Sequence, residues 1–341
     1  MSQVADVEVE VFFQKGLHLN KVGEYAKALA SYDKALELQP DYADAWYSRG
    51  NALYRLGRYQ EALASYDRAI EVKPGFHEAW NNRGNALDDL GRYEEAIASY
   101  DKALKFKADY YWGWNNRGIA LKNLGRYEEA IVSYDRAIEF YPKYYWAWYN
   151  RAMALANCRR IDKAIACLDK ALEFKPDFHE AWYHRGIALQ NLGQHFAAFA
   201  SLEESLIIKP NNADAWYFRA VSLDSLGHYE KALASYDKAL EIQSDKYCWN
   251  GRGLVLLNLG RYAEALASFD KALAIKPDDA SARYNKARCY ALQNHVDLAI
   301  ENLQHAIYLN PYKYREMARS HSDFQSIQDH LLFQALIQSG S

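Results

Sequence analysis

The chain has 341 residues, half of them apolar, and it contains nine tryptophans and 28 tyrosines, which is ample material for a continuous hydrophobic core. Its formal net charge of -3 gives no general attraction to nucleic-acid phosphates or anionic membranes, and this argues against both as partners. The N-terminal MSQVADVEVEVFF has acids where a secretory signal has positive charge, and no run approaches the roughly 18 apolar residues of a membrane span. The cysteines form no C-x-x-C pair and are expected to be free thiols, so we expect a cytoplasmic protein.

The segment 77–110 recurs along the chain as a tandem repeat, and its positions are numbered here as places 1 to 34. Small residues recur at places 8 and 20, an aromatic residue or leucine recurs at place 24, and all seven prolines lie at place 32. Tryptophan recurs at place 4 as Trp46, Trp80, Trp114, Trp148, Trp182, Trp216 and Trp249. A fixed period of this kind is typical of stacked supersecondary units, because one such unit cannot bury its apolar face alone.

Each repeat is expected to form two helices. Places 4, 8 and 11 share one face of a helix, and places 20, 24 and 27 repeat that spacing in a second helix. Glycine at place 15 suits a left-handed residue at the end of the first helix. Glycine at place 8 and alanine at place 20 should let the two helix backbones approach closely, so a bulky residue at either place would overpack the pair.

The combination W-x2-R-G-x2-L, followed by G-x-Y-x2-A-x3-Y-x2-A and a closing P, resembles the tetratricopeptide repeat family over roughly residues 9 to 313. This resemblance implies an all-α fold, a right-handed superhelical solenoid of about nine antiparallel helix pairs with a concave, partner-binding groove. Residues 1–8 are expected to form an N-terminal tail, and residues 314–341 a C-terminal capping helix and tail. The repeats are expected at 9–42, 43–76, 77–110, 111–144, 145–178, 179–212, 213–245, 246–279 and 280–313.

Some repeats depart from the pattern. Repeat one has Phe12 instead of the tryptophan and is expected to cap the array, and repeat five has Arg159 at the glycine of place 15. The connection between repeats seven and eight is one residue shorter, which predicts a local change in the angle between helices. After repeat nine, Phe324, Ile327 and Leu331 form an apolar stripe, which predicts an amphipathic capping helix.

Arginine at place 7 lies beside the buried face of the first helix, and a partly buried guanidinium favours a carboxylate partner. Place 25 supplies an acid in every repeat but the last, where Gln304 accompanies Lys286 at place 7. We therefore expect structural Arg–acid pairs between adjacent helices. Arg83→Leu, with Asp67 and Asp101 intact, should destabilise the fold.

Places 2, 5, 9, 12 and 13 cluster on the side of the first helix away from the core, with place 6 at the edge of this cluster. In the resembling family this side lines the concave surface. It is rich in asparagine, tyrosine, tryptophan and acids, where an ordinary solvated helix would carry Glu and Lys. The residues expected to bind a peptide there are Tyr47, Asn51, Asn81, Asn82, Asn85, Trp112, Asn115, Asn116, Trp146, Tyr149, Asn150, Tyr183, His184 and Tyr217.

Asparagines one repeat apart offer both donors and acceptors to an extended peptide backbone, or they serve packing between helices. Trp112 and Trp146, with neighbouring tyrosines, either form an exposed interaction surface or pack on the preceding repeat. Acids outnumber bases along the groove, which predicts a neutral-to-basic protein or peptide partner with an apolar anchor.

We expect a non-enzymatic protein-interaction scaffold with no catalytic residue, cofactor or metal. His179 and His184 flank an HE pair, but they are five residues apart instead of the four that a zinc-protease helix requires. The alternatives are binding of single-stranded RNA by stacking on Trp112 and Trp146, and a regulatory subunit of an enzyme complex. Self-association through the end faces of the array is also open.

Overall fold

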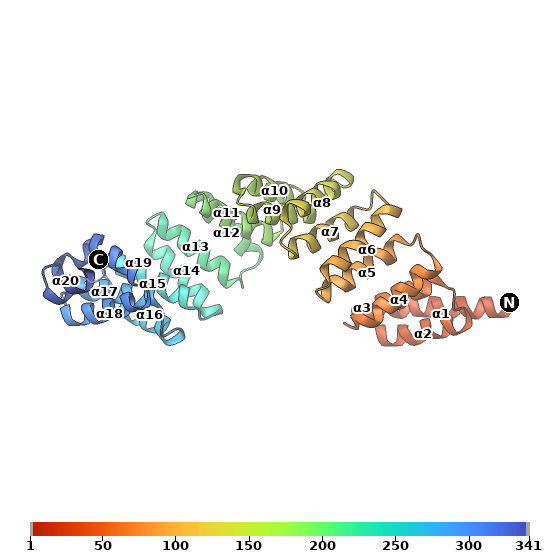
Figure 1. Cartoon of the computed structure of the whole chain (residues 1–341), viewed down its shortest axis with the longest axis horizontal. Coiled ribbons are helices and arrows are strands. Elements are labelled where there is room, and N and C mark those ends of the chain that lie inside the picture. Colours follow the sequence, from red (N-terminus) through yellow and green to blue (C-terminus); the bar gives the residue numbers. More distant parts are fainter. Residues whose placement is uncertain (1–2, 339–341) are drawn as a thin grey trace. The chain divides into compact units, whose positions relative to one another are not determined.

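The computed structural model describes residues 3–338, which form α helices and one 3-10 helix and contain no strand (Figure 1). Successive helices pair, and within each pair the first helix packs on the second. The all-α fold of consecutive antiparallel helix pairs expected from the sequence is therefore confirmed. The chain divides into two compact parts, residues 1–176 and residues 177–341.

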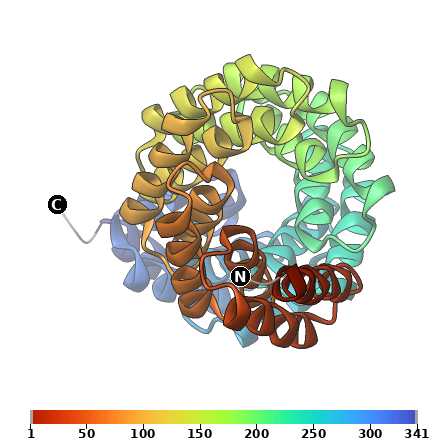
Figure 2. The same ribbon diagram turned by 90° about the vertical axis from the view of Figure 1, so that its right-hand side faces the viewer.

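The N-terminal part contains five helix pairs, and each second helix packs on the first helix of the following pair where both lie in this part. Figure 2 shows these pairs from the N-terminal end. Their bounds are α1 (Gln3–Lys21), α2 (Tyr25–Leu38), α3 (Ala43–Arg55), α4 (Tyr59–Val72), α5 (His77–Asp89), α6 (Tyr93–Phe106), α7 (Tyr111–Asn123), α8 (Tyr127–Phe140), α9 (Tyr145–Asn157) and α10 (Ile161–Phe174).

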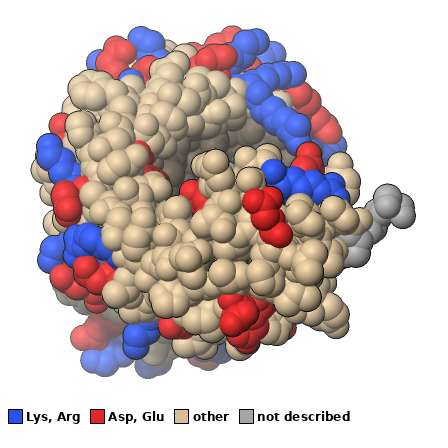
Figure 3. Space-filling view, turned by 90° about the vertical axis from the view of Figure 1, so that its left-hand side faces the viewer, with Lys and Arg blue, Asp and Glu red and all other residues tan. Residues whose placement is uncertain are grey.

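The C-terminal part contains four helix pairs followed by three shorter helices. Figure 3 views the end of the molecule at which these lie, and the surface seen there is mostly uncharged, with charged side chains at its margin and some acidic ones nearer the middle. The bounds are α11 (His179–Asn191), α12 (His195–Ile208), α13 (Ala213–Ser225), α14 (Tyr229–Ile242), α15 (Lys246–Asn258), α16 (Tyr262–Ile275), α17 (Ala280–Leu292), α18 (Val296–Leu309), α19 (Pro311–Ser320), η1 (Ser322–Ile327) and α20 (Leu331–Gln338).

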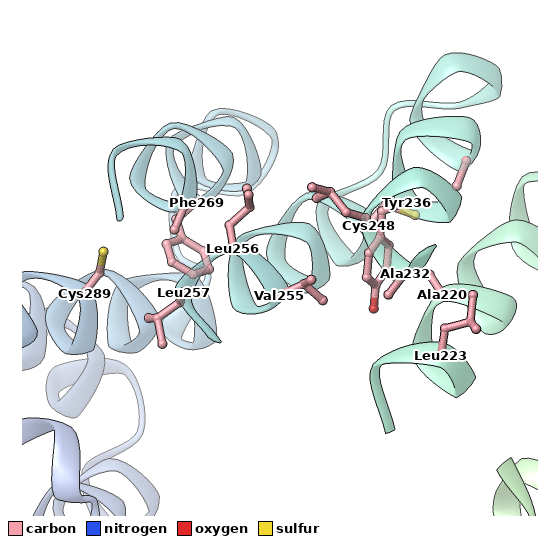
Figure 4. Close-up of a cluster of buried hydrophobic side chains, with 13 residues drawn as sticks. Ala220, Leu223, Ala232, Tyr236, Cys248, Val255, Leu256, Leu257, Phe269 and Cys289 are labelled. Carbon is pink, nitrogen blue, oxygen red and sulfur yellow. The ribbon is translucent and has the colours of Figure 1, made fainter. Parts of the chain in front are cut away.

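The core repeats along each part in step with the sequence. The alanines of place 20, from Ala28 to Ala299, are fully buried, as are the large residues of place 24. In the C-terminal part, Figure 4 shows Tyr236 and Phe269, both from place 24, lying among side chains of the neighbouring helices. Where place 8 is glycine it makes room for this residue, because a Cβ atom at Gly84 would lie only 2.5 Å from Cε1 of Tyr100. Repeat seven has Ala220 at place 8, and its Tyr236 ring lies against Gly251 of the next repeat. The close approach that the sequence predicts is therefore between the first helix and a ring of the second helix.

The turn within each repeat uses a left-handed residue. Gly57, Gly91 and Gly125 have φ of 73°, 73° and 76°, as place 15 predicts. Where glycine is missing, the backbone keeps this conformation, with φ of 59° at Arg159 and 58° at Asn294. Asparagine tolerates this region, whereas an arginine does so at a steric cost.

Arg159→Gly is expected to raise the free energy of unfolding by about 0.5–1 kcal/mol, because it relieves the left-handed strain while adding some entropy to the unfolded chain. Urea denaturation followed by circular dichroism measures the change. Gly91→Ala serves as the reverse control at φ of 73° and should destabilise. A lower urea midpoint for Arg159→Gly would contradict the prediction.

The two ends differ from what the sequence predicts. Residues 3–8, expected to be a tail, belong to α1. The C-terminal segment is three short helices instead of one capping helix. Phe324 and Ile327 are buried as expected, but Leu331 is 81% exposed and Phe333 is buried instead. The reason is that the chain turns between Ile327 and Leu331, so the stripe does not continue on one helix face.

Candidate functional site

The first helices are held in place by basic residues of place 7, and seven of them reach back to the acid at place 25 of the preceding repeat. The pairs are Arg49 Nε–Asp33 Oδ1 (2.7 Å), Arg83 Nε–Asp67 Oδ1 (2.6 Å), Arg117 Nε–Asp101 Oδ1 (2.7 Å), Arg151 Nε–Asp135 Oδ1 (2.6 Å), Arg219 Nη2–Glu203 Oε1 (3.0 Å), Arg252 Nε–Asp237 Oδ1 (2.7 Å) and Lys286 Nζ–Asp270 Oδ1 (2.5 Å). The arginine also donates from Nη1 to place 23 of its own repeat, as Arg83 does to Ser99 at 2.7 Å. Each guanidinium of this kind therefore joins two repeats.

The direction of these pairs settles a choice that the sequence left open. Arg83 pairs with Asp67 of the repeat before it, and Lys286 likewise pairs with Asp270 of the preceding repeat. The guanidinium also lies over the tryptophan of place 4, with 6.0 Å from Arg83 Cζ to the Trp80 ring centroid. The arginine is thus a structural residue.

The asparagines of place 6 also bond to the preceding repeat. Asn82 Nδ2 donates to Asn51 Oδ1 at 2.9 Å and to Tyr47 OH at 3.1 Å. Asn116 Nδ2 donates to Asn81 Oδ1 at 3.2 Å and to Asn85 Oδ1 at 3.1 Å. These amides form a hydrogen-bonded series across the first helices.

The same series continues in repeat five and reaches the second helices. Asn150 Nδ2 donates to Asn115 Oδ1 at 3.0 Å. Tyr100 OH on α6 donates to Asn85 Oδ1 at 2.8 Å. The amides therefore tie the first helices to one another and to the buried rings.

Three of the residues expected to bind a peptide are buried. Asn81 and Asn115 are each 3% exposed and Asn150 is 7% exposed, so their amides are not available to a ligand in this conformation. This corrects their assignment to the groove, and the physical reason is that each of these three amides lies against the neighbouring first helix and is hydrogen-bonded to it. Asn51, Asn82, Asn85 and Asn116 keep part of their surface exposed.

Two adjoining pockets lie on the first helices of repeats one to four, and Tyr54 and Asn85 line both. The larger, of about 370 Å³, is lined by Asn20, Tyr47, Asn51, Tyr54, Arg55, Tyr66, Asn82 and Asn85. The smaller, of about 80 Å³, is lined by Tyr54, Asn85, Asp88, Asp89, Tyr100, Asn116 and Ile119. The two together are called the first-helix groove below.

The acidic end of the groove is partly desolvated. Burial raises the pKa of the Asp88 carboxyl, Asp89 raises it further, and a hydrogen bond with Asn123 opposes the rise. Burial likewise lowers the pKa of Lys122, against the attraction of Asp88. Tyr54 OH donates to Asp89 Oδ2. A half-buried carboxylate in such a place gains from a cation that enters the groove.

Asp88→Asn is expected to stabilise the protein at neutral pH. The pKa of this carboxyl is higher in the folded protein than in the unfolded chain, so the folded state binds the proton more tightly. Below the unfolded pKa both states are protonated, and the carboxyl does not lower the free energy of unfolding. As the pH rises through the folded pKa the carboxyl ionises and lowers the free energy of unfolding. Urea denaturation of wild type and variant between about pH 4 and about pH 7 should therefore diverge as the pH rises. Parallel curves would contradict the prediction.

Aromatic side chains also gather at the start of α7 and of α9, outside the lining of these two pockets. Trp112 is 48% exposed and Trp146 is 38% exposed. Tyr111 contacts Trp112 and Tyr144, with ring centroids 4.5 Å and 5.1 Å apart, and Trp146 contacts Tyr149 at 5.8 Å. The expected aromatic band is therefore partly packed and partly open to solvent.

In the C-terminal part the predicted residues also lie on first helices. Tyr183 contacts His184 at 4.9 Å and Phe218 at 6.1 Å between ring centroids. Tyr217 lines a separate pocket of about 470 Å³. These residues form a second candidate surface, on the first helices of the C-terminal part.

Family models described as the tetratricopeptide repeat match residues 13–75, 49–111 and 250–313, residues 111–144, 145–178 and 213–246, and residues 167–200. The chain belongs to the tetratricopeptide repeat family. Over 41 residues, 12% of this chain, it is 39% identical to an uncharacterized protein of Methanocaldococcus jannaschii, and it spans about half (48%) of the length of that curated relative.

Solved tetratricopeptide repeat structures resemble the fold. One from Parabacteroides merdae is 20% identical with a TM-score of 0.53, covering 71% of this chain and 97% of that one. PilW, a type IV pilus biogenesis factor, is 23% identical with a TM-score of 0.55, covering 62% of this chain and 96% of that one. At these identities the likeness shows the fold alone.

Tetratricopeptide repeat proteins are in general interaction scaffolds. Between residues 3 and 338, no three His, Cys, Asp or Glu side chains gather as they would around a metal ion. None of the described helices combines the length and apolar character needed to cross a bilayer.

Sequence reasoning left several groove residues of these tetratricopeptide repeats out of the predicted set. Asn20 and Tyr66 line the larger pocket, and Asp88 and Asp89 line the smaller. Tyr66 occupies the core place 24. Its ring lies against Gly50, and its hydroxyl donates to Asn51 at the pocket. The acids carried a signal, because they stand at places 12 and 13 on the groove side of the wheel.

Proposed function

We propose that this chain is a non-enzymatic scaffold that holds an extended segment of another protein in the first-helix groove. The observation that carries the proposal is the pair of adjoining pockets across α3, α5 and α7, which present polar side chains, together with the half-exposed Trp112 on the same helix α7. Ligand sites in proteins are commonly concave, with apolar and aromatic surface and a few placed polar groups. Family membership supports a protein as the partner.

The groove's chemistry favours a neutral-to-basic segment with an apolar anchor. Asp88 and Asp89 lie at one pocket, and burial already disfavours the charged form of Asp88, so a lysine or arginine of the partner would stabilise it. Trp112 and Trp146 offer exposed rings for an apolar side chain. Asn51 and Asn85 would supply the remaining polar contacts.

Affinity capture with the full chain, followed by quantitative mass spectrometry, tests the groove. Trp112→Ala and Asp89→Asn are each expected to reduce recovery of the specific partner by about ten-fold or more. Phe106→Ala is the matched control, because Phe106 is 49% exposed, close to the 48% of Trp112, but lies on a second helix. Equal recovery by wild type and both groove variants would reject the groove as the site.

Single-stranded RNA is the second candidate, and the exposed rings of Trp112 and Trp146 are the observation that favours it. The carboxylates of Asp88 and Asp89 oppose it, because phosphate binding needs lysine and arginine. Titration of a labelled oligouridylate at about 50 mM and about 200 mM salt separates the two, since an RNA complex loses affinity steeply with salt. Binding that disappears at the higher salt would favour RNA.

A further inference from the structure

Repeats one and two bury the same group of three rings. The ring at place 5 lies 6.0 Å (Phe13–Tyr32) and 6.2 Å (Tyr47–Tyr66) from the ring at place 24. A third ring, from the residue just before the next first helix, covers place 5, with centroids 4.8 Å apart for both Phe13–Tyr42 and Tyr47–Phe76. Phe76 is only 6% exposed, so this third ring is part of the core.

Repeat seven has the first two rings and lacks the third. Tyr217 at place 5 lies 6.0 Å from Tyr236 at place 24, as in repeats one and two. The residue before α15 is Asp245, whose carboxylate instead accepts hydrogen bonds from the backbone N–H groups of Tyr247 and Cys248. Within residues 213–248, all of them described, no ring of the α14–α15 connection contacts Tyr217, since residues 243–245 are Gln, Ser and Asp.

A pocket of about 470 Å³ lies at this place in repeat seven. Its lining residues are Ala213, Asp214, Tyr217, Phe218, Gln243, Asp245, Tyr247 and Cys248. They include aromatic rings and two carboxylates but no lysine or arginine. Figure 4 shows Cys248, one of these residues, beside Tyr236 in the buried hydrophobic cluster. The nearest cation in the sequence, Lys246, binds Asp279 at 3.3 Å, and its Nζ also lies 4.3 Å from the centroid of the Tyr247 ring at the pocket.

We propose that this pocket binds an aromatic side chain of a partner protein, with a neighbouring basic residue of that partner held by Asp214 and Asp245. The ring is inferred because the chain's own Tyr42 and Phe76 cover place 5 in repeats one and two. The basic neighbour is inferred from two carboxylates without a compensating cation among the lining residues. The inference rests on the proposed role in protein binding but not on the first-helix groove.

The pocket is a binding site and not a thiol-chemistry site. Burial raises the pKa of the Cys248 thiol to about 12, with Asp245 and Asp214 adding to the rise, so the thiol is neutral at physiological pH. Its side chain is 5% exposed and fills the pocket floor as an apolar group. Cysteine here replaces the alanine that most repeats have at place 3.

Blocked tripeptides test the ligand class on the full wild-type chain. The probes are acetyl-Gly-Tyr-Arg-amide, acetyl-Gly-Ala-Arg-amide and acetyl-Gly-Tyr-Glu-amide, titrated by NMR with selectively labelled tyrosine. The first should bind, and loss of the ring should weaken binding about ten-fold or more, as expected for burial of one aromatic side chain. The glutamate peptide should also be weaker. Equal affinity of the tyrosine and alanine peptides would overturn the proposal.

Two substitutions at one position locate the site. Asp245→Phe supplies the missing ring from the chain itself and should abolish binding of acetyl-Gly-Tyr-Arg-amide. Asp245→Ala also removes the N-cap of α15 and the charge, but it leaves the pocket open. This variant should still bind the tyrosine peptide more tightly than the alanine peptide. Circular dichroism checks both folds. Unchanged binding by Asp245→Phe would overturn the proposal, and so would loss of binding by a folded Asp245→Ala.

Asp214→Asn, on an exposed carboxylate, provides a test that leaves the core untouched. It should reduce the preference for the arginine peptide over the glutamate peptide, and an unchanged preference would reject the role of Asp214. Trp112→Ala lies in the other part of the chain and should leave all three peptides unaffected. Failure of the pocket and failure of the first-helix groove are therefore distinguishable.

Discussion

Gly84→Ala is expected to lower the free energy of unfolding by about 1–3 kcal/mol, an unusually large effect for one added methyl group. A Cβ atom there would lie 2.5 Å from Cε1 and 2.8 Å from Cζ of Tyr100. Tyr100 is 2% exposed and its hydroxyl is bonded to Asn85, so the ring has no free volume into which it can move. Urea denaturation of the full chain measures the loss.

The chain itself supplies the control for this prediction. Repeat five pairs Ala152 at place 8 with Leu168 at place 24, both buried, so alanine is tolerated where the ring is absent. Repeat seven keeps a ring, Tyr236, with Ala220 at place 8, but there the ring lies against Gly251 of the next repeat. The cost of Gly84→Ala should therefore be smaller in a Tyr100→Leu background, and a double-mutant cycle measures this coupling. The same cost in both backgrounds would show that the ring is not the obstacle.

Arg83→Leu is expected to destabilise by about 1–2 kcal/mol, because it breaks charge-assisted hydrogen bonds that join two repeats. The variant loses the bond from Nε to Asp67 (2.6 Å), the bond from Nη1 to Ser99 (2.7 Å) and the contact over Trp80. The Asp67 side chain is 48% exposed and keeps its hydration, which limits the loss. Thermal and urea denaturation of the full chain give the change.

Arg92→Leu is the matched control for Arg83→Leu. Arg92 pairs with Glu95 at 2.6 Å, but both side chains are about half exposed (41% and 52%) and belong to the same repeat. Such surface pairs contribute little, so we expect a change below about 0.5 kcal/mol. If both substitutions lower the free energy of unfolding by the same amount, the arginines of place 7 contribute no more to stability than exposed surface ion pairs do.

Much of the architecture was predictable because the pattern that builds it is local and repeated. Alternation of large and small residues at places 4, 8, 20 and 24 predicts both helices of each repeat, and glycine at place 15 predicts the left-handed turn. The chemistry of arginine near a buried face predicts a carboxylate partner. The sequence did not fix which repeat supplies it, because one period separates two equivalent acids, Asp67 and Asp101 for Arg83.

The candidate site was less predictable, because exposure in a repeat array depends on the neighbouring repeat. A helical wheel places Asn81 and Asn115 away from their own core, but the next first helix covers them. The exposed members, such as Asn85 and Trp112, are indistinguishable from them by wheel position. The repeat-seven pocket lies where the connection before α15 has Asp245 instead of a ring, and this difference stands out only when the rings of repeats one and two are compared in space.

The direction of the arginine pairs bears on how such an array changes length. Where the pairs are seen within each part, a repeat carries a cation that faces backward and an acid that faces forward. Duplication or deletion of a whole period would therefore preserve every pairing across the new boundary without a compensating substitution. An insertion of part of a repeat would separate the arginine from its acid. Insertions and deletions in this chain should therefore be tolerated best when they comprise whole repeats.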